Sequence, residues 1–234
     1  MTQETQQQET QQPVLALDHV SYSYTKGGRN VLNDVSMAFE PGKMYAITGP
    51  SGAGKTTLLS LISGLTTPTQ GAVEYEGKSL AEINRYDYRS QDIGVIFQSF
   101  NLLPSLTVAE NIELSMDASG REFSEPKSDI IARLLQQVHL PVEYAKQRIL
   151  HLSGGEQQRV AIARALSYDP HIILADEPTG NLDPSTQADI VNIFRQLAHE
   201  QNRCVILVTH SPAVAQAADH VIQLTKLQRP VVQQ

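Results

Sequence analysis

Residues 49–56 read Gly49-Pro50-Ser51-Gly52-Ala53-Gly54-Lys55-Thr56, which matches the pattern G-x-x-x-x-G-K-S/T in full. An apolar run, Met44–Thr48, comes before this stretch, and Thr56–Ser63 follows it as a predicted helix that ends before Gly64. Glycines in such a turn let successive N–H groups point at one anion near a helix N-terminus, where the helix dipole adds to the attraction. The pattern therefore predicts a strand, a phosphate-binding loop and a helix, in that order.

Two side chains of this loop carry its chemistry. We expect Lys55 to place its ammonium group on the β- and γ-phosphates of a nucleotide, and Thr56 to offer its hydroxyl to Mg²⁺. A glycine-rich turn can also do no more than cap a helix, but a strand before it and a helix after it are the context of phosphate binding. The predicted nucleotide-binding residues are Gly49, Pro50, Ser51, Gly52, Ala53, Gly54, Lys55, Thr56 and Thr57.

The composition of the 234 residues is that of a globular protein, with 41% hydrophobic and 18% charged residues. The net charge of −7 repels a phosphate backbone, so we expect no broad nucleic-acid binding. No run reaches the roughly 18 apolar residues of a membrane span, so we expect no direct membrane insertion. The glutamine-rich residues 1–13 are predicted to form a disordered tail. The single cysteine, Cys204, lies in an apolar run and is expected to be buried and inert.

Apolar runs alternate with helical patterns along the chain beyond Pro13. Buried strands separated by helices imply an α/β fold with a largely parallel sheet that is covered on both faces. From Thr107 to about Leu150 the pattern is helical, which predicts a helical subdomain, at about 99–165, inserted into the α/β core. The predicted strands after the phosphate-binding loop include Ile93–Phe97, Ile172–Ala175, Cys204–Thr209 and Val221–Leu224, and the predicted helices include Glu156–Leu166, Pro184–Glu200 and Pro212–Ala218.

Two carboxylates, Asp176 and Glu177, come directly after a predicted buried strand. The carboxyl ends of strands in an open α/β sheet line its ligand crevice, so both side chains can reach one nucleotide. We expect Asp176 to hold Mg²⁺, directly or through water, and Glu177 to accept a proton from the attacking water. Two acids after a strand often only begin a loop, and the phosphate-binding loop elsewhere in the chain is what favours the catalytic interpretation.

A second candidate anion site lies at residues 152–159. Ser153 and Glu156 have the spacing of a capping box, which explains a helix start but not the two glycines between them. Glycines at a helix N-terminus leave accessible N–H donors. Because one nucleotide needs only one such site, we expect these donors to serve the nucleotide of a neighbouring subunit. The stretch reads Leu152-Ser153-Gly154-Gly155-Glu156-Gln157-Gln158-Arg159.

With these motifs in this order, the chain resembles the ATP-binding subunits of ABC transporters, whose Leu-Ser-Gly-Gly-Gln signature it matches with Glu156 ahead of Gln157. The resemblance runs from about Leu15 to Leu224. It implies an α/β fold of the P-loop NTPase type, with an antiparallel β subdomain and the inserted helical subdomain, in an ABC domain spanning 14–228. It also implies ATP and Mg²⁺ as cofactors, ATP hydrolysis, a homodimer in the ATP-bound state and an integral-membrane permease as partner. The implied location is cytoplasmic and peripheral, on the inner face of the cell membrane, through that permease.

The resemblance also implies roles for single residues. Tyr24 stands where an aromatic ring stacks on adenine, with Tyr22 as a second candidate, and either ring could instead pack in the core. Gln98 matches the glutamine that senses Mg²⁺ and links to the permease, and His210 matches the histidine that contacts the γ-phosphate. The implied catalytic residues are Lys55, Gln98, Glu177 and His210, the implied metal ligands are Thr56, Gln98 and Asp176, and the implied partner-facing residues are Ser153, Gly154, Gly155 and Asp183.

Asp183 belongs to Asn181-Leu182-Asp183, which matches a loop at the dimer interface of the family. Followed by Pro184, Asp183 is also an ordinary helix N-cap, and both interpretations can hold. The residues 175–183 most resemble the ATPases of macrolide export, lipoprotein release and cell division. An ATPase of the cell-division type, which signals across the membrane without transport, would have the same site, so this alternative stays open.

Three further features bear on the resemblance. Ser211 stands where an aspartate commonly follows the histidine, and Thr225-Lys226-Leu227 replaces a late Asp-Gly hairpin. The apolar segment Ser99–Leu106 follows Gln98 directly. We expect part of it to form a groove for a short permease helix, although its side chains could also pack the core of the helical subdomain.

Overall fold

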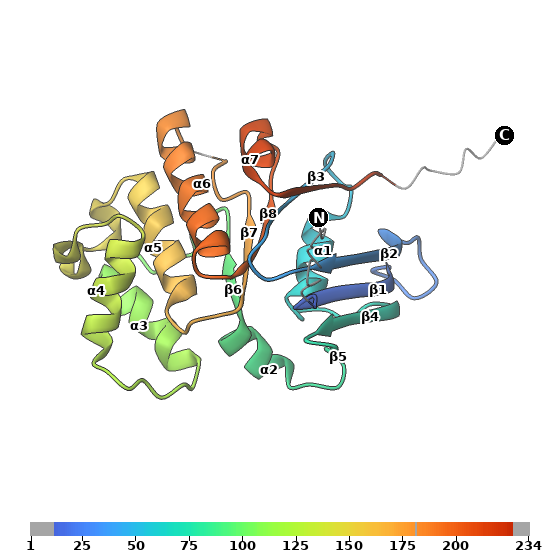
Figure 1. Ribbon diagram of the computed structural model, residues 1–234, viewed down its shortest axis with the longest axis horizontal. Helices are drawn as coiled ribbons and strands as arrows, with labels where there is room; N and C mark the ends of the chain where they lie inside the picture. Colours follow the sequence, from blue (N-terminus) through green and yellow to red (C-terminus); the bar gives the residue numbers. More distant parts are fainter. Residues whose placement is uncertain (1–11, 181, 227–234) are drawn as a thin grey trace, which may run out of the picture.

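The computed structural model describes residues 12–180 and 182–226. It contains two β-sheets, with helices between and beside them (Figure 1). The predictions that concern residues 1–11, Asn181 and Leu227 lie outside the described residues.

The first sheet is four-stranded and antiparallel, in the order β2-β1-β4-β5. In β4, Val73 and Tyr75 are buried while the residues between and beside them are more exposed, so one face of the strand packs inward. This sheet confirms the antiparallel part of the expected fold. Its strands are β1 (Leu15–Tyr22), β2 (Leu32–Phe39), β4 (Gln70–Tyr75) and β5 (Lys78–Ser79).

The second sheet is five-stranded and parallel, in the order β6-β7-β8-β3-β9. Along β7, Ile173 and Ala175 join one hydrophobic core with the helices, whereas Ile172 and Leu174 join a second core with the antiparallel sheet. The sheet is therefore covered on both faces, as predicted, and Cys204 is buried in β8. The strands are β3 (Met44–Thr48), β6 (Ile93–Ile96), β7 (Ile172–Asp176), β8 (Cys204–Val208) and β9 (His220–Gln223).

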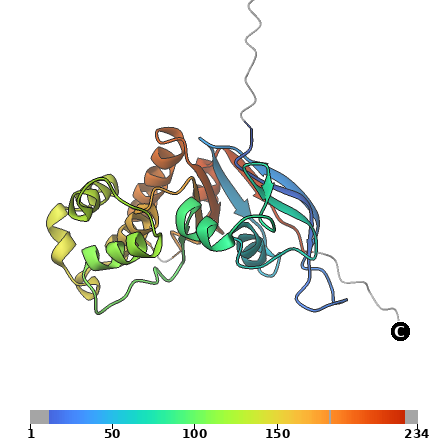
Figure 2. The same cartoon turned by 90° about the horizontal axis from the view of Figure 1, so that it is seen from below.

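The helices divide between the two cores. Helix α1 (Lys55–Ile62) packs between the two sheets through Leu58, Leu61 and Ile62, which are buried with residues of both. Figures 1 and 2 place α3 and α4 at one end of the molecule and the antiparallel sheet at the other. The remaining helices are α2 (Arg85–Asp87), α3 (Val108–Ala118), α4 (Lys127–Gln137), α5 (Gly154–Leu166), α6 (Pro184–His199) and α7 (Pro212–Ala217), with a π-helix at Tyr88–Asp92 and 3₁₀ turns at Val142–Lys146 and Ile149–His151.

Side-chain caps fix where four of the described helices begin, with Asn84 at α2 and three longer helices besides. Reciprocal capping boxes start α3 and α5, through Thr107 with Glu110 and through Ser153 with Glu156. Asp183 caps α6 by accepting from the hydroxyl of Ser185 and from the N–H groups of Ser185 and Thr186, which holds the pKa of its carboxyl well below the usual range. In the part of the chain that the structure describes, no helix is both long enough and apolar enough to span a bilayer.

Candidate functional site

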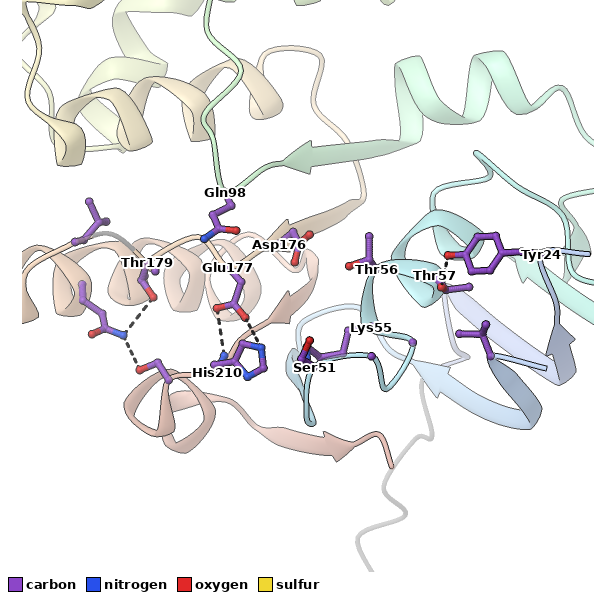
Figure 3. A pocket seen from close by; sticks show the side chains of 17 residues that line it. Tyr24, Ser51, Lys55, Thr56, Thr57, Gln98, Asp176, Glu177, Thr179 and His210 are labelled. Atoms are coloured by element: carbon purple, nitrogen blue, oxygen red, sulfur yellow. Dashed lines mark hydrogen bonds and ion pairs between the residues drawn. The ribbon is translucent and has the colours of Figure 1, made fainter. Parts of the chain in front are cut away.

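A pocket of about 880 Å³ opens where the strands β3, β7 and β8 end. The carboxyl ends of parallel strands are the usual ligand site of an open α/β sheet. Figure 3 shows Gln98, Asp176, Glu177 and His210 gathered on one side, with Thr56 and Lys55 beside them and Tyr24 farther along. The pocket is lined by Tyr24, Val31, Ser51, Gly52, Gly54, Lys55, Thr56, Thr57, Gln98, Asp176, Glu177, Thr179, Gly180, Leu182, Gln187, His210 and Ser211.

The loop between β3 and α1 curls in the way the glycine pattern predicts. Gly49 has a φ of 147°, and a Cβ atom there would lie 2.4 Å from the carbonyl oxygen of Leu224, so only glycine fits. The Nζ of Lys55 donates to the carbonyl oxygens of Gly49 at 2.8 Å and of Pro50 at 3.3 Å. These bonds hold the ammonium group over the loop, at the N-terminus of α1, where an anion would bind.

Of the two candidate tyrosines, Tyr24 lines the pocket and Tyr22 is absent from its lining. Tyr24 is 70% exposed, and its hydroxyl shares a hydrogen bond of 2.8 Å with Thr57 Oγ1. Tyr22 lies edge-on to Tyr24, with ring centroids 5.2 Å apart, and packs against the core of the antiparallel sheet. The geometry therefore makes Tyr24 the ring that a flat ligand group could contact.

Glu177 has an unusual backbone and an unusual carboxylate. Its φ of 47° lies in the left-handed region, which costs a non-glycine residue energy and is common where function requires it. The backbone N–H of His210 donates to Glu177 Oε2 at 3.2 Å, and His210 Nε2 lies 3.5 Å from Oε1. Oε1 is buried and has no hydrogen-bond partner. A buried acceptor without a donor is suited to take a proton from a water molecule that binds next to it.

Asp176 ends β7 and is half-buried. Burial raises the pKa of its carboxyl, while nearby Lys55 and His210 act in the opposite direction. Thr56, Gln98 and Asp176 bring a hydroxyl, an amide and a carboxylate to the same pocket. Oxygen donors with one carboxylate suit Mg²⁺, which usually completes its shell with water and substrate phosphates. Among the described residues no group of three acidic, His or Cys side chains could hold a metal ion.

The predicted second anion site does not line this pocket. Ser153, Gly154 and Gly155 lie at the start of α5, and a Cβ on Gly154 would come within 3.9 Å of Leu182, which is at the rim of the pocket. Ser153 is exposed; its backbone N–H and its hydroxyl both donate to Glu156 Oε2, at 2.7 and 2.8 Å. These bonds lower the pKa of the Glu156 carboxyl. Because Ser153 and Gly154 are exposed, a neighbouring molecule can reach the start of α5. Asp183 likewise lies outside the pocket lining.

The sequence reasoning missed three polar residues of the pocket wall. Thr179 lies within the stretch that resembles the family, but its hydroxyl had no assigned role. Gln187 Nε2 donates to Thr179 Oγ1 at 3.2 Å and to Ser211 Oγ at 2.7 Å. Gln187 carries no sequence signal, because a glutamine in a helix is ordinarily solvated, and Ser211 stands out in the sequence only as a departure from the family.

The site can now be compared with known proteins. A family model described as ABC transporter matches residues 32–180. The ABC transporter ATP-binding protein YclH of Bacillus subtilis strain 168 is 40% identical over 213 residues, which cover 91% of this chain and 94% of that protein. LolD 1 of Rhodopirellula baltica, the ATP-binding protein of a lipoprotein-releasing system, is 40% identical over 222 residues, which cover 90% and 93%.

Solved structures give the same result. The dimeric structure of MJ0796, a bacterial ABC transporter cassette, has a TM-score of 0.80 at 36% identity and covers 90% of this chain and 94% of that chain. A second dimeric structure of MJ0796, in a post-hydrolysis state bound to ADP and Pi, has a TM-score of 0.80 at 34% identity and covers 92% and 97%. The chain therefore belongs to the ABC transporter family, as an ATP-binding subunit that hydrolyses ATP.

Proposed function

We propose that two copies of this chain enclose two Mg-ATP between them and that the cycle of ATP binding and hydrolysis drives a separately encoded membrane permease. The observation that carries the proposal is the Glu177 carboxylate, which lines the same pocket as the phosphate-binding loop and whose Oε1 has no hydrogen-bond partner. The lipoprotein-releasing name of one relative favours transport over signalling of the cell-division type. The proposed domain spans 14–228, with the helical subdomain at about 99–165.

Each site combines residues with separate roles. Lys55 and the loop N–H groups bind the β- and γ-phosphates, Tyr24 stacks on adenine, and His210 contacts the γ-phosphate. Thr56, Gln98 and Asp176 hold Mg²⁺, which supplies positive charge next to the phosphate oxygens. Glu177 accepts the proton of the attacking water. Catalysis then consists of positioning and electrostatic stabilisation, which phosphoryl transfer mainly requires.

The partner subunit completes the site. The N–H groups of Gly154 and Gly155 lie at the start of α5, outside this chain's own pocket, and would bind the partner's γ-phosphate. The Ser153 hydroxyl, which donates to Glu156, would exchange that bond for one to the phosphate. Asp183 would likewise contribute to the site of the partner. The dimeric MJ0796 structures support this arrangement. ATP would then hold the two copies together, and hydrolysis would release them.

The permease would be reached through the segment after Gln98. Within Ser99–Leu106, Leu103 is 44% exposed, whereas Leu102 packs against the core of the helical subdomain. Leu103 is therefore the residue of this pair that can offer apolar surface to a permease helix. Contact with a permease would place the chain on the cytoplasmic face of the membrane.

Glu177→Gln tests the proposal, because it keeps the size and removes the proton acceptor. ATP turnover should fall by roughly 10²–10⁴ while ATP binding remains, since this is the usual contribution of a general base. Gel filtration should show a dimer of this variant in Mg-ATP and a monomer without it, because the bound state accumulates. Lys55→Ala should instead weaken ATP binding itself.

The matched control is Glu200→Gln, an exposed carboxylate at the end of α6. Its turnover should equal that of the unaltered protein. Near-normal turnover by Glu177→Gln would exclude this residue as the base, and a monomer at saturating ATP would exclude the two-copy site.

A further inference from the structure

The side-chain amide of Gln187, in the pocket wall, links two segments of the chain: one contains Glu177 and the other contains His210. Gln187 Nε2 carries two hydrogens and donates one to Thr179 Oγ1 and the other to Ser211 Oγ, at 3.2 and 2.7 Å (Figure 3). Thr179 is 5% exposed, and all three bonded groups are at least partly buried. Buried hydrogen bonds of this kind hold their partners in one geometry because an unsatisfied donor or acceptor would be costly.

The hydroxyl of Ser211 does not cap the helix that follows it. Ser211 occupies the N-cap of α7, where a serine usually accepts from the first free N–H groups, yet it makes no such capping bond. It accepts the Gln187 amide instead, and its own N–H donates to Thr209 Oγ1 at 3.0 Å. Both polar groups of Ser211 therefore fix the backbone on either side of His210.

The two ends of this bridge are next to the catalytic pair. Thr179 lies two residues after Glu177, in a turn closed by the bond from Gly180 N–H to Glu177 O, and Ser211 follows His210 directly. His210 and Glu177 meet through contacts of 3.2 and 3.5 Å, so a small shift of either segment would separate them. Gln187 itself sits one turn into α6, and its N–H bonds to the carbonyl oxygen of Asp183.

We propose that Gln187 is a positioning residue for hydrolysis: it clamps the segments of Glu177 and His210 at a fixed spacing through Thr179 and Ser211. The inference rests on the proposed function of Glu177 and His210. Through Gln187, helix α6 would then affect the geometry of the proton acceptor. The proposed function assigns Asp183, the N-cap of α6, to the dimer interface. Gln187 acts on the reaction through the two hydroxyls and does not need to touch the nucleotide.

The test compares Gln187→Ala, Ser211→Ala and the double variant with the unaltered protein. Each single change should lower kcat roughly fivefold or more, the equivalent of about one hydrogen bond, and leave KM for ATP little changed. Because both changes break the same bond, the double variant should be no slower than the slower single variant. Asn192→Ala removes an exposed amide from the same helix and should leave kcat unchanged.

Two further measurements keep a positioning role apart from a purely structural one. Gln187→Met keeps the approximate length of the side chain but has no N–H to donate, so its kcat should fall like that of Gln187→Ala, while thermal unfolding stays near that of the unaltered protein. Losses of kcat that multiply in the double variant, an increase in KM alone, or an unchanged kcat would each overturn the proposal. Glu177→Gln is measured in parallel: if it hydrolyses ATP normally, the assignment of the base fails, whatever Gln187 does.

Discussion

Gly49 is the residue at which the phosphate-binding loop depends most on the absence of a side chain. A Cβ there would press against the carbonyl oxygen of Leu224, a backbone atom that cannot move away cheaply. Gly77 also has a positive φ, 74°, but nothing lies within 4 Å of a Cβ there. Gly77 therefore shows the cost of a left-handed backbone alone, whereas Gly49 combines a clash with a φ of 147°, outside the left-handed helical region.

We expect Gly49→Ala to lower the melting temperature clearly more than Gly77→Ala, which bears only the roughly 1–2 kcal/mol of a left-handed alanine. Gly49→Ala should also weaken ATP binding, because the N–H groups of the loop would turn away from the phosphates. Thermal unfolding and ATP titration of both variants check this. Equal melting temperatures would show that the loop relaxes around the new side chain.

At the scale of elements, helix α5 holds the segment after Gln98 in an unusual conformation. Phe100 and Asn101 both have left-handed φ angles, 58° and 51°, which two consecutive non-glycine residues rarely adopt. The guanidinium of Arg164, near the end of α5, donates to the carbonyl oxygens of both, at 2.9 Å for Phe100. Burial lowers the pKa of Arg164, and the forked group compensates by binding two carbonyls at once.

We expect Arg164→Lys to destabilise the protein by about 1–2 kcal/mol, because an ammonium group cannot span both carbonyls. Amide exchange should become faster across residues 98–106, since the left-handed pair loses its support. The control is Arg195→Lys, an exposed arginine on α6. A protection pattern unchanged from that of the unaltered protein would mean that the segment holds its shape without Arg164.

These elements also show which structural features can be predicted from sequence patterns. The capping box at Ser153 and the cap at Asp183 could be predicted because each depends on residues three or fewer positions apart. Strand β1 was not predicted, because a register shift between Leu17 and Val20 breaks its alternation of apolar residues.

The candidate site also contains features that the sequence predicts and features that it does not. The residues from contiguous motifs, such as Lys55 and Glu177, could be named from the sequence, and the pocket brings them together. Arg164 bonds to residues 63 and 64 positions away in the sequence, and Gln187 bonds to a residue 24 positions away. Such contacts depend on how the elements pack, and no local pattern of residue types reports them.

At the scale of the whole molecule, the proposed contact with a permease can be tested by changing one exposed side chain. Leu103→Ser should abolish co-purification with a co-expressed permease while folding and basal ATP turnover are retained, because Leu103 does not support the core. Leu102→Ser should instead lower the melting temperature, since Leu102 packs on the core.

Val221→Ser is the control, because Val221 is 55% exposed on β9, at the opposite edge of the sheet from β6 and Gln98. It should bind the permease normally. Normal binding by Leu103→Ser would place the contact on another surface.

The order of strands in the parallel sheet has a consequence for the growing chain on the ribosome. Among the described residues, strand β3 is almost wholly buried and pairs with β8 and β9 alone, which come more than 150 residues later. At the usual rate of synthesis, this strand waits roughly 8–30 s for a neighbour. The phosphate-binding loop starts where β3 ends, so ATP cannot stabilise the nascent chain during that wait. The early, locally paired strands β1, β2 and β4 can fold meanwhile, which leaves β3 as the segment that a chaperone would need to shield.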